Sequence, residues 1–320
     1  MRARATIAIL LAAMGAEAPA AAQQNAFGHG VDRLYLSAPG AGWFVMDSLA
    51  MHGRLSGTFG MTLDYAHDPL RISSAAGARP LPVVANELLT NLGIAATYDR
   101  YRVSLDFNAP LLLEGSNGTV GERTYTAPDV NPGSRPDTLG DVRLGFDARL
   151  YGAADGAFRA GLGVQLFAPT GDRSNYFTDH TYRAMARMLV AGDRGRLTYA
   201  GHLGAHVRPL DEASVPGSPR GSELLFGVAG GATFLPCPSC GMRLVVGPEL
   251  YGASAFRSFF GRSATALEAL FGARLEGTAD DRLQLRIKLG VGAGNAMFGA
   301  PDARVVVGVE LFECFSKPER

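Results

Sequence analysis

The sequence has little lysine, little cysteine and a single tryptophan among its 320 residues. Lys288 and Lys317 are the only lysines, so nearly all of the positive charge is carried by arginine. Thirty basic residues balance thirty acidic ones, for a formal net charge of zero. Proteins that bind a polyanion normally carry a basic excess. We therefore expect no nucleic acid partner.

Long apolar runs are also missing, except at the N-terminus. Arg2 and Arg4 precede an apolar run over residues 5–14, and small residues follow up to Ala22. This order is typical of a secretory signal peptide over residues 1–22. No later run approaches the roughly 18 residues that a transmembrane helix needs. The mature chain is then periplasmic, extracellular or an outer-membrane barrel.

Strict alternation of apolar and polar residues separates these options. Residues 54–65 alternate over a dozen positions, and the same period returns at 102–108, 141–150, 282–289 and 304–310. A period of two indicates strands, and about ten residues suffice for a tilted strand to cross a bilayer. We expect about twelve strands, near residues 53–67, 83–98, 101–113, 139–152, 157–168, 180–192, 195–208, 221–234, 241–254, 263–278, 281–296 and 302–312.

The connections between these strands alternate in length. Short ones fall at 99–100, 153–156, 193–194 and 279–280, and long ones at 114–138, 169–179, 209–220 and 255–262. Outer-membrane barrels have short periplasmic turns and long outer loops. The sequence therefore predicts an all-β, antiparallel up-and-down barrel over residues 53–312. A periplasmic segment at 23–52 precedes it, and a short periplasmic tail at 313–320 follows.

An exported β-sandwich is the alternative, because it would also alternate. Two observations oppose it. One face of all twelve expected strands is nearly free of charge, and lysine, which commonly protects exposed strand edges, is nearly absent. Both favour strands that face lipid in a closed barrel.

Three short motifs resemble a known family. LDYAHDPL at 63–70, LGDVRL at 139–144 and FAPTGD at 167–172 are similar to stretches in the N-terminal barrels of OmpA-family outer-membrane proteins of myxobacteria and their relatives. The last motif is also similar to barrels of the transporter type. The resemblance implies an outer-membrane location, with membrane lipid and the barrel-assembly machinery as partners.

The polar face of the strands would line the lumen. The expected lumen residues carry mixed charge with a basic excess: Arg54, Asp64, Arg102, Asp106, Arg143, Asp147, Arg149, Arg159, Arg183, Arg187, His202, His206, Glu223, Arg243, Glu249, Glu268, Arg274, Arg286 and Lys288. Arginines can line a path for anions. Alternatively, paired charges fill and close the lumen. The choice depends on whether inward acids face inward arginines, which requires the strand register.

No constellation for catalysis is found, and we expect no enzyme, no cofactor and no metal. There is no Gly-x-Ser-x-Gly motif, and none of His180, His202 and His206 is followed two residues later by serine, so a lipid hydrolase is the weakest alternative. Cys237 and Cys240 lie in an expected turn, where an oxidising compartment favours a disulfide. Free thiols are the alternative.

The sequence thus predicts a monomeric barrel that acts as a narrow channel or passive transporter for small polar or anionic solutes. A structural or surface-interaction barrel with a closed, salt-bridged lumen is the competing prediction.

Overall fold

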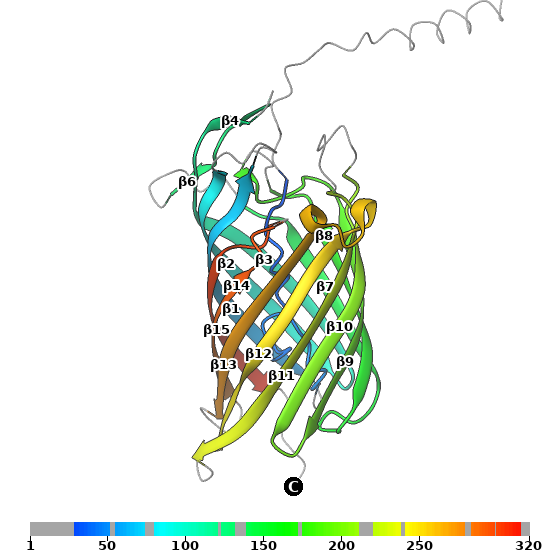
Figure 1. The fold of residues 1–320 in the computed structure, drawn as a ribbon. Helices are drawn as coiled ribbons and strands as arrows, with labels where there is room; N and C mark the ends of the chain where they lie inside the picture. The colour runs from blue at the N-terminus through cyan, green and yellow to red at the C-terminus, as the bar shows by residue number, and fades with distance from the viewer. Residues whose placement is uncertain are drawn as a thin grey trace, which may run out of the picture.

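Twelve long antiparallel strands form a barrel (Figure 1). The computed structural model describes residues 29–51, 55–73, 80–120, 123–131, 139–171, 175–210, 220–237, 241–278, 283–297 and 299–314. The barrel strands in these residues are β1 (Ser56–Ile72), β2 (Leu81–Tyr98), β3 (Tyr101–Glu114), β7 (Val142–Tyr151), β8 (Arg159–Ala168), β9 (Arg183–Arg194), β10 (Leu197–Val207), β11 (Glu223–Cys237), β12 (Met242–Ala255), β13 (Thr265–Thr278), β14 (Leu283–Gly294) and β15 (Ala303–Cys314).

The first and last strands close the ring. β1 pairs with β2 on one side and with β15 on the other, in register from Ser56 opposite Cys314 to His67 opposite Ala303. β3 pairs with both β2 and β7. Closure gives every barrel strand a partner on both sides, which a bilayer requires because it offers no water to unpaired backbone groups. The predicted antiparallel barrel of about twelve strands is confirmed.

The two ends of the barrel differ in their connections. At one end, here called the turn end, residues 99–100 join β2 to β3 and residues 195–196 join β9 to β10. At the opposite loop end, residues 115–141 hold the short strands β4 (Gly118–Val120), β5 (Arg123–Tyr125) and β6 (Asp129–Val130). The 3-10 turns η3 (Phe256–Ser258) and η4 (Arg262–Ala264) join β12 to β13 there. β1 begins and β15 ends at the turn end, the lower end in Figure 1.

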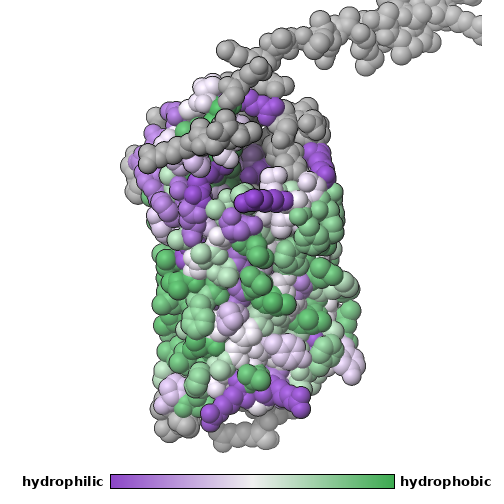
Figure 2. All heavy atoms as spheres, in the orientation of Figure 1, coloured by the Kyte–Doolittle hydropathy of each residue, from purple (hydrophilic) through white to green (hydrophobic). Residues whose placement is uncertain are grey.

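The outer surface is apolar around the middle of the barrel. Figure 2 shows hydrophobic residues between two more polar ends on the face in view. Residues of the predicted outer face are exposed on this surface, among them Phe59, Val103, Leu289 and Val305. Within the described residues, no helix is long and apolar enough to cross a bilayer.

Exposed aromatic side chains gather near both ends of this apolar surface. At the turn end, Tyr101 stacks on Phe146 with ring centroids 6.1 Å apart. At the loop end, Phe256, Phe259 and Phe260 are all exposed, and the rings of Phe259 and Phe260 are 4.4 Å apart. Outer-membrane barrels carry aromatic girdles where lipid meets water. The aromatic residues therefore mark the two edges of a lipid-facing belt.

A charge placed in the middle of the belt should destabilise the barrel. Leu289 lies in the middle of β14 and is 52% exposed. Leu289→Arg should lower the free energy of unfolding in lipid by about 2–4 kcal/mol. Leu283→Arg, on the same face at the end of β14, should lower it by about 0–1 kcal/mol. Equal effects of the two variants in denaturant titrations would contradict a lipid-facing belt.

Candidate functional site

Residues 29–51, here called the lumen segment, run inside the barrel from the loop end to the turn end (Figure 1). Most of this segment is buried, including Leu34, Trp43, Met46 and Leu49. This corrects the expected periplasmic segment over 23–52, as far as the structure describes it. The segment has no strand periodicity, but its apolar side chains still require burial, and the lumen provides it.

The loop end holds the beginning of the segment. The backbone N–H of Gly30 donates to Asp179 Oδ1 at 2.9 Å, and the N–H of Val31 donates to the carbonyl of Tyr176 at 3.0 Å. Arg208 donates to the carbonyl of Gly30 at 3.0 Å and pairs with Asp179 at 2.6 Å. Burial alone would raise the pKa of Asp179, but the guanidinium of Arg208 holds this pKa well below its usual range. Asp179 is therefore a charged acceptor.

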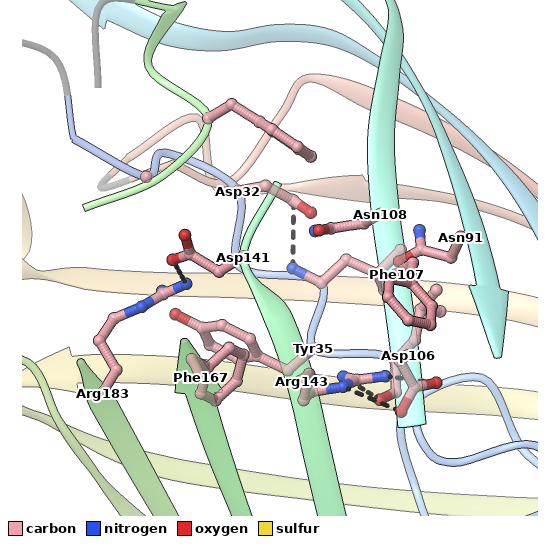
Figure 3. A pocket seen from close by; sticks show the side chains of 14 residues that line it. Asp32, Tyr35, Asn91, Asp106, Phe107, Asn108, Asp141, Arg143, Phe167 and Arg183 are labelled. Carbon is pink, nitrogen blue, oxygen red and sulfur yellow. Dashed lines mark hydrogen bonds and ion pairs between the residues drawn. The ribbon is translucent and has the colours of Figure 1, made fainter. Parts of the chain in front are cut away.

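The upper part of the segment borders a polar cavity of about 60 Å³ (Figure 3). Tyr35 packs edge-on against His206, with ring centroids 5.0 Å apart. Charged and amide side chains from the segment, the wall and the loop before β7 also line the cavity: Asp32, Asn91, Asp106, Asn108, Asp141, Arg143 and Arg183. A polar space of this size accommodates a few water molecules.

One buried carboxylate holds the middle of the segment. Glu249 on β12 accepts the backbone N–H groups of Phe44, Val45 and Met46 at 2.8, 2.9 and 3.2 Å. These amides have no partner in a strand or helix, and an unsatisfied buried N–H is costly. Hydrogen bonds to an ionised acceptor are stronger than neutral ones. Glu249 thus anchors three consecutive amides of the segment at the centre of the lumen.

Arginines hold the last part of the segment. Arg102 donates to both carboxylate oxygens of Asp47, at 3.0 and 2.8 Å, and lies 3.5 Å from Asp147. Arg149 donates to the carbonyls of Leu49 and Met51 at 3.2 and 2.9 Å. The segment is therefore attached to the wall along its whole length, by contacts that are all noncovalent among the described residues.

Aromatic side chains of the segment pack against cations of the wall. The guanidinium of Arg274 lies 4.7 Å from the centre of the Trp43 ring, and the Lys288 ammonium lies 5.0 Å from that of Phe44. Cation–π contacts of this kind stabilise desolvated cations. Apolar residues of the segment and the wall form one buried cluster beside them, which includes Met46, Leu49, Leu189, Val245 and Leu270.

The wall also carries ion pairs between neighbouring strands. Arg143 on β7 pairs with Asp106 on β3 at 3.1 Å. Arg286 on β14 donates to Glu276 on β13 at 2.9 Å and to Glu310 on β15 at 2.7 Å. The register therefore places inward acids beside inward arginines, as the closed-lumen alternative required.

The structure places the predicted lumen residues on the inward face of the strands. Arg183, His202, Arg243 and Arg286 are half-buried. The others are buried: Asp64, Arg102, Asp106, Arg143, Asp147, Arg149, Arg159, Arg187, His206, Glu223, Glu249, Glu268, Arg274 and Lys288. Arg54 and Cys240 lie outside the described residues, as does the side chain of Cys237, so the predicted disulfide stays a prediction.

Several important lumen residues were not in the predicted set. They are Asp32, Arg33 and Asp47 of the lumen segment, Asp141, Asp179 and Arg208 of the loop end, and Glu87, Arg304 and Glu310 of the wall. Alternation with exposed valines could have identified Arg304 and Glu310. The additional acids reduce the basic excess that the sequence suggested.

The remaining charge is unevenly distributed around the lumen. The strands β3, β7, β8 and β9 are neighbours in the sheet. They carry four buried arginines: Arg102, Arg143, Arg149 and Arg187. Arg187 is 3% exposed and has no hydrogen bond or ion pair among the described residues. Asp64, Glu87 and Glu268 lie on β1, β2 and β13. The wall thus has a basic side, where Asp106 and Asp147 offset part of the positive charge, and an acidic side around Arg304.

Comparisons with solved structures agree with this fold. An outer membrane channel from Pseudomonas putida F1 is 14% identical with a TM-score of 0.51, over 82% of this chain and 97% of that one. The NanC porin (10% identity, TM-score 0.44) and the KdgM porin (9%, 0.41) each match 82% of this chain, and 100% and 99% of their own. No family model and no curated protein matches the chain. The closed ring of strands and the match to the Pseudomonas putida channel show that the chain has the fold of an outer-membrane barrel.

Loss of the charge on Glu249 should loosen the lumen segment. Hydrogen bonds to a charged group contribute about 1.5–3 kcal/mol, and each 1.4 kcal/mol corresponds to about tenfold. In Glu249→Gln, the amides of residues 44–46 should therefore exchange hydrogen about ten- to a hundredfold faster. Asp193→Asn is the control, because Asp193 pairs with Arg159 and Arg243 and makes no described contact with the segment. Equal exchange in both variants would contradict the role of Glu249.

Proposed function

We propose that this protein is an outer-membrane channel for small polar or anionic solutes, and that the lumen segment closes it in the conformation described here. One observation carries the proposal. The twelve-stranded barrel is wide enough to hold a whole peptide segment along its length, and the wall behind that segment is lined with charged and polar side chains. Displacement of the segment would leave a polar passage.

The way in which the segment is held supports a reversible closure. Its contacts with the wall are hydrogen bonds, ion pairs and apolar packing, and it forms no strand within the barrel sheet. Barrel strands cannot leave without breaking the ring of backbone hydrogen bonds. The lumen segment can move without breaking any of them, so it is the element suited to gate the passage.

The orientation follows from the connections. Outer-membrane barrels place short turns in the periplasm and long loops outside the cell. We therefore assign the turn end to the periplasm and the loop end to the cell exterior. The same proposal includes export by the predicted signal peptide and insertion into the membrane by the barrel-assembly machinery. The resemblance to OmpA-family barrels stays a prediction.

The basic side of the lumen favours anions once the segment is displaced. Asp47 now neutralises part of this side through Arg102, and its departure would leave Asp147 as the only described ion-pair partner of Arg102. Arg187 is the best candidate for contact with a passing anion, since none of the described residues pairs with it. An arginine that lines a narrow passage lowers the barrier for anions.

A structural barrel with a permanently closed lumen is the second candidate. The ion pairs across β13, β14 and β15 and the full-length lumen segment favour it. The two candidates differ in one measurable property, which is whether the purified protein conducts ions.

Single-channel recording in planar bilayers tests the proposed channel. The natural protein should show long closed periods with brief openings, and Glu249→Gln should open more often because its lumen segment is held less firmly. Asp193→Asn should behave like the natural protein. Absence of conductance in the natural protein and in Glu249→Gln would favour the closed structural barrel.

Selectivity of the open state tests the role of the basic side. Under a salt gradient, the reversal potential of the natural protein should indicate a preference for anions. Arg187→Ala should reduce this preference, because it removes a positive charge that forms no described hydrogen bond or ion pair. An unchanged reversal potential would contradict the proposed contact between Arg187 and anions.

Acid should favour the open state through His29. Burial, and then nearby cations led by Arg220, lower the pKa of His29 well below its usual value when the segment is in place. A displaced His29 in water has a pKa of about 6.5, so the displaced state binds more protons below that pH. A change from pH 7.5 to 5 should raise the open probability by up to about thirtyfold through this group. His29→Phe should reduce this response, and an identical response in the variant would exclude His29 as its source.

A further inference from the structure

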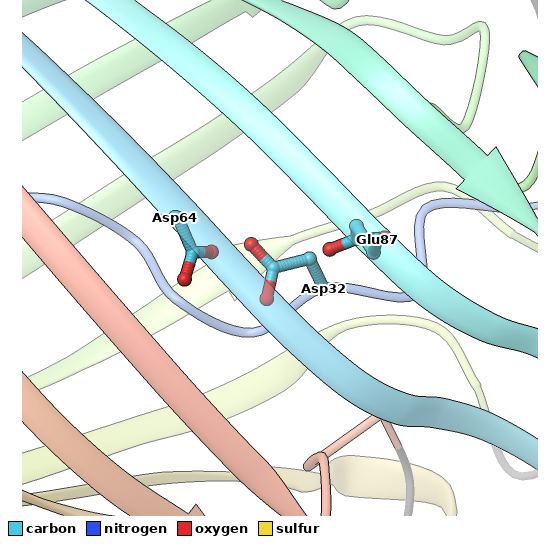
Figure 4. A group of neighbouring side chains, drawn as sticks. All are labelled: Asp32, Asp64 and Glu87. Carbon is cyan, nitrogen blue, oxygen red and sulfur yellow. The ribbon is translucent and has the colours of Figure 1, made fainter. Parts of the chain in front are cut away.

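Three carboxylates from different parts of the chain meet in the lumen (Figure 4). Asp32 comes from the lumen segment, Asp64 from β1 and Glu87 from β2, and one oxygen of each lies within 4.8 Å of the others. Asp64 and Glu87 are each 1% exposed. The group therefore links the lumen segment to the acidic side of the wall.

Positive charge is insufficient around this group. Arg304 donates to Asp32 at 2.6 Å, to Glu268 at 2.8 Å and to Asp64. When ionised, Asp32, Asp64, Glu87 and Glu268 carry four negative charges against the single positive charge of Arg304. Within the described residues, no second cation forms an ion pair with these four acids. With all four acids ionised, a net negative charge would be left inside the protein, so a cation or a proton must neutralise it.

Glu87 is the acid of this group that has no described partner at all. It has no hydrogen bond and no ion pair among the described residues, and its Oε1 is fully buried without a partner. Oδ1 of Asp64 is in the same state. In Figure 4 the carboxylate of Glu87 points toward Asp32. A buried carboxylate with no partner is costly, so this unpartnered side chain beside two other acids requires a neutralising cation or proton.

The spacing and the donor atoms select the kind of cation. Calcium binds oxygen at about 2.3–2.6 Å, so two oxygens on opposite sides of the ion lie about 4.6–5.2 Å apart. The three oxygens lie within 4.8 Å of one another, so a single calcium ion can contact all three. Zinc prefers nitrogen and sulfur donors, whereas all three donors here are carboxylates. Asp32 also borders the polar cavity, so space for water lies beside this ligand of the group.

We propose that Asp32, Asp64 and Glu87 bind one calcium ion, and that this ion fastens the lumen segment to β1 and β2. Arg304 holds Asp32 and Asp64 in position by hydrogen bonds. The carboxylate of Glu87 has no other described partner, so the ion would be its counter-charge. Binding of the ion is independent of the proposed channel activity. Its effect on gating rests on that activity, because a fastened segment keeps the passage closed.

Calcium binding to the refolded full-length barrel in detergent tests the proposal directly. After treatment with a chelator, equilibrium dialysis with radioactive calcium at pH 7.5 should detect one ion per chain. Glu87→Gln and Asp32→Asn should each weaken binding by at least about tenfold, since each removes a charged ligand. Glu114→Gln is the matched control, because Glu114 is exposed at the loop end and contacts Asn86, and its affinity should be unchanged.

Two results would overturn the site. One is the absence of binding to the natural protein at about 1 mM calcium, the weak end of protein calcium sites, which would indicate that a shared proton neutralises Glu87. The other is natural affinity in both Glu87→Gln and Asp32→Asn. Asp32 belongs to the lumen segment and to none of the barrel strands. Asp32→Asn therefore keeps the test valid if Glu87→Gln fails to fold.

Channel recording in bilayers with and without calcium distinguishes calcium binding from its proposed effect on gating. Calcium should reduce the open probability of the natural protein at least about tenfold and have little effect on Asp32→Asn. Calcium binding without a change in gating would keep the site and exclude the fastening role. A protein that binds calcium but never conducts would contradict the channel and leave the site intact.

Discussion

Closure of the β-sheet into a ring constrains every other feature of this protein. Each barrel strand has a neighbour on both sides, from β1 through β15 and back to β1. In a closed ring, alternate side chains must point outward or inward. The outward set meets lipid and is apolar. The inward set is then free to be polar, but the space that it encloses must be filled or hydrated.

The lumen segment solves this problem in a particular way. A peptide without secondary structure brings unsatisfied backbone groups into a confined space, and these groups must find partners. Asp179, Glu249 and Arg149 provide partners at successive levels of the lumen. Some charged side chains of the wall therefore serve as hydrogen-bond partners for the backbone of the segment, and others pair with one another.

Much of the fold was predictable from the sequence because period-two alternation depends on local residues. Phe59, Val103 and Val305 are exposed on the outer face as expected, and the inward arginines follow by parity. The lumen segment was not predictable in this way. Residues 29–51 have no periodicity, and their position depends on contacts with distant groups such as Glu249, 205 residues after Phe44. The meeting of Asp32, Asp64 and Glu87 required both the strand register and the path of the segment.

The path of the lumen segment also limits the order in which the molecule can assemble. The segment precedes β1 in the chain, yet the seam between β1 and β15 joins the two ends of the barrel sequence. A peptide that lies along the axis of a closed ring cannot enter through the wall. Either the seam forms around the segment, or the segment is drawn end-on through a finished barrel, past side chains as large as Trp43. The first route makes the last step of strand pairing also the step that captures the segment, and it couples the rate of barrel closure to the burial of Trp43 and Phe44.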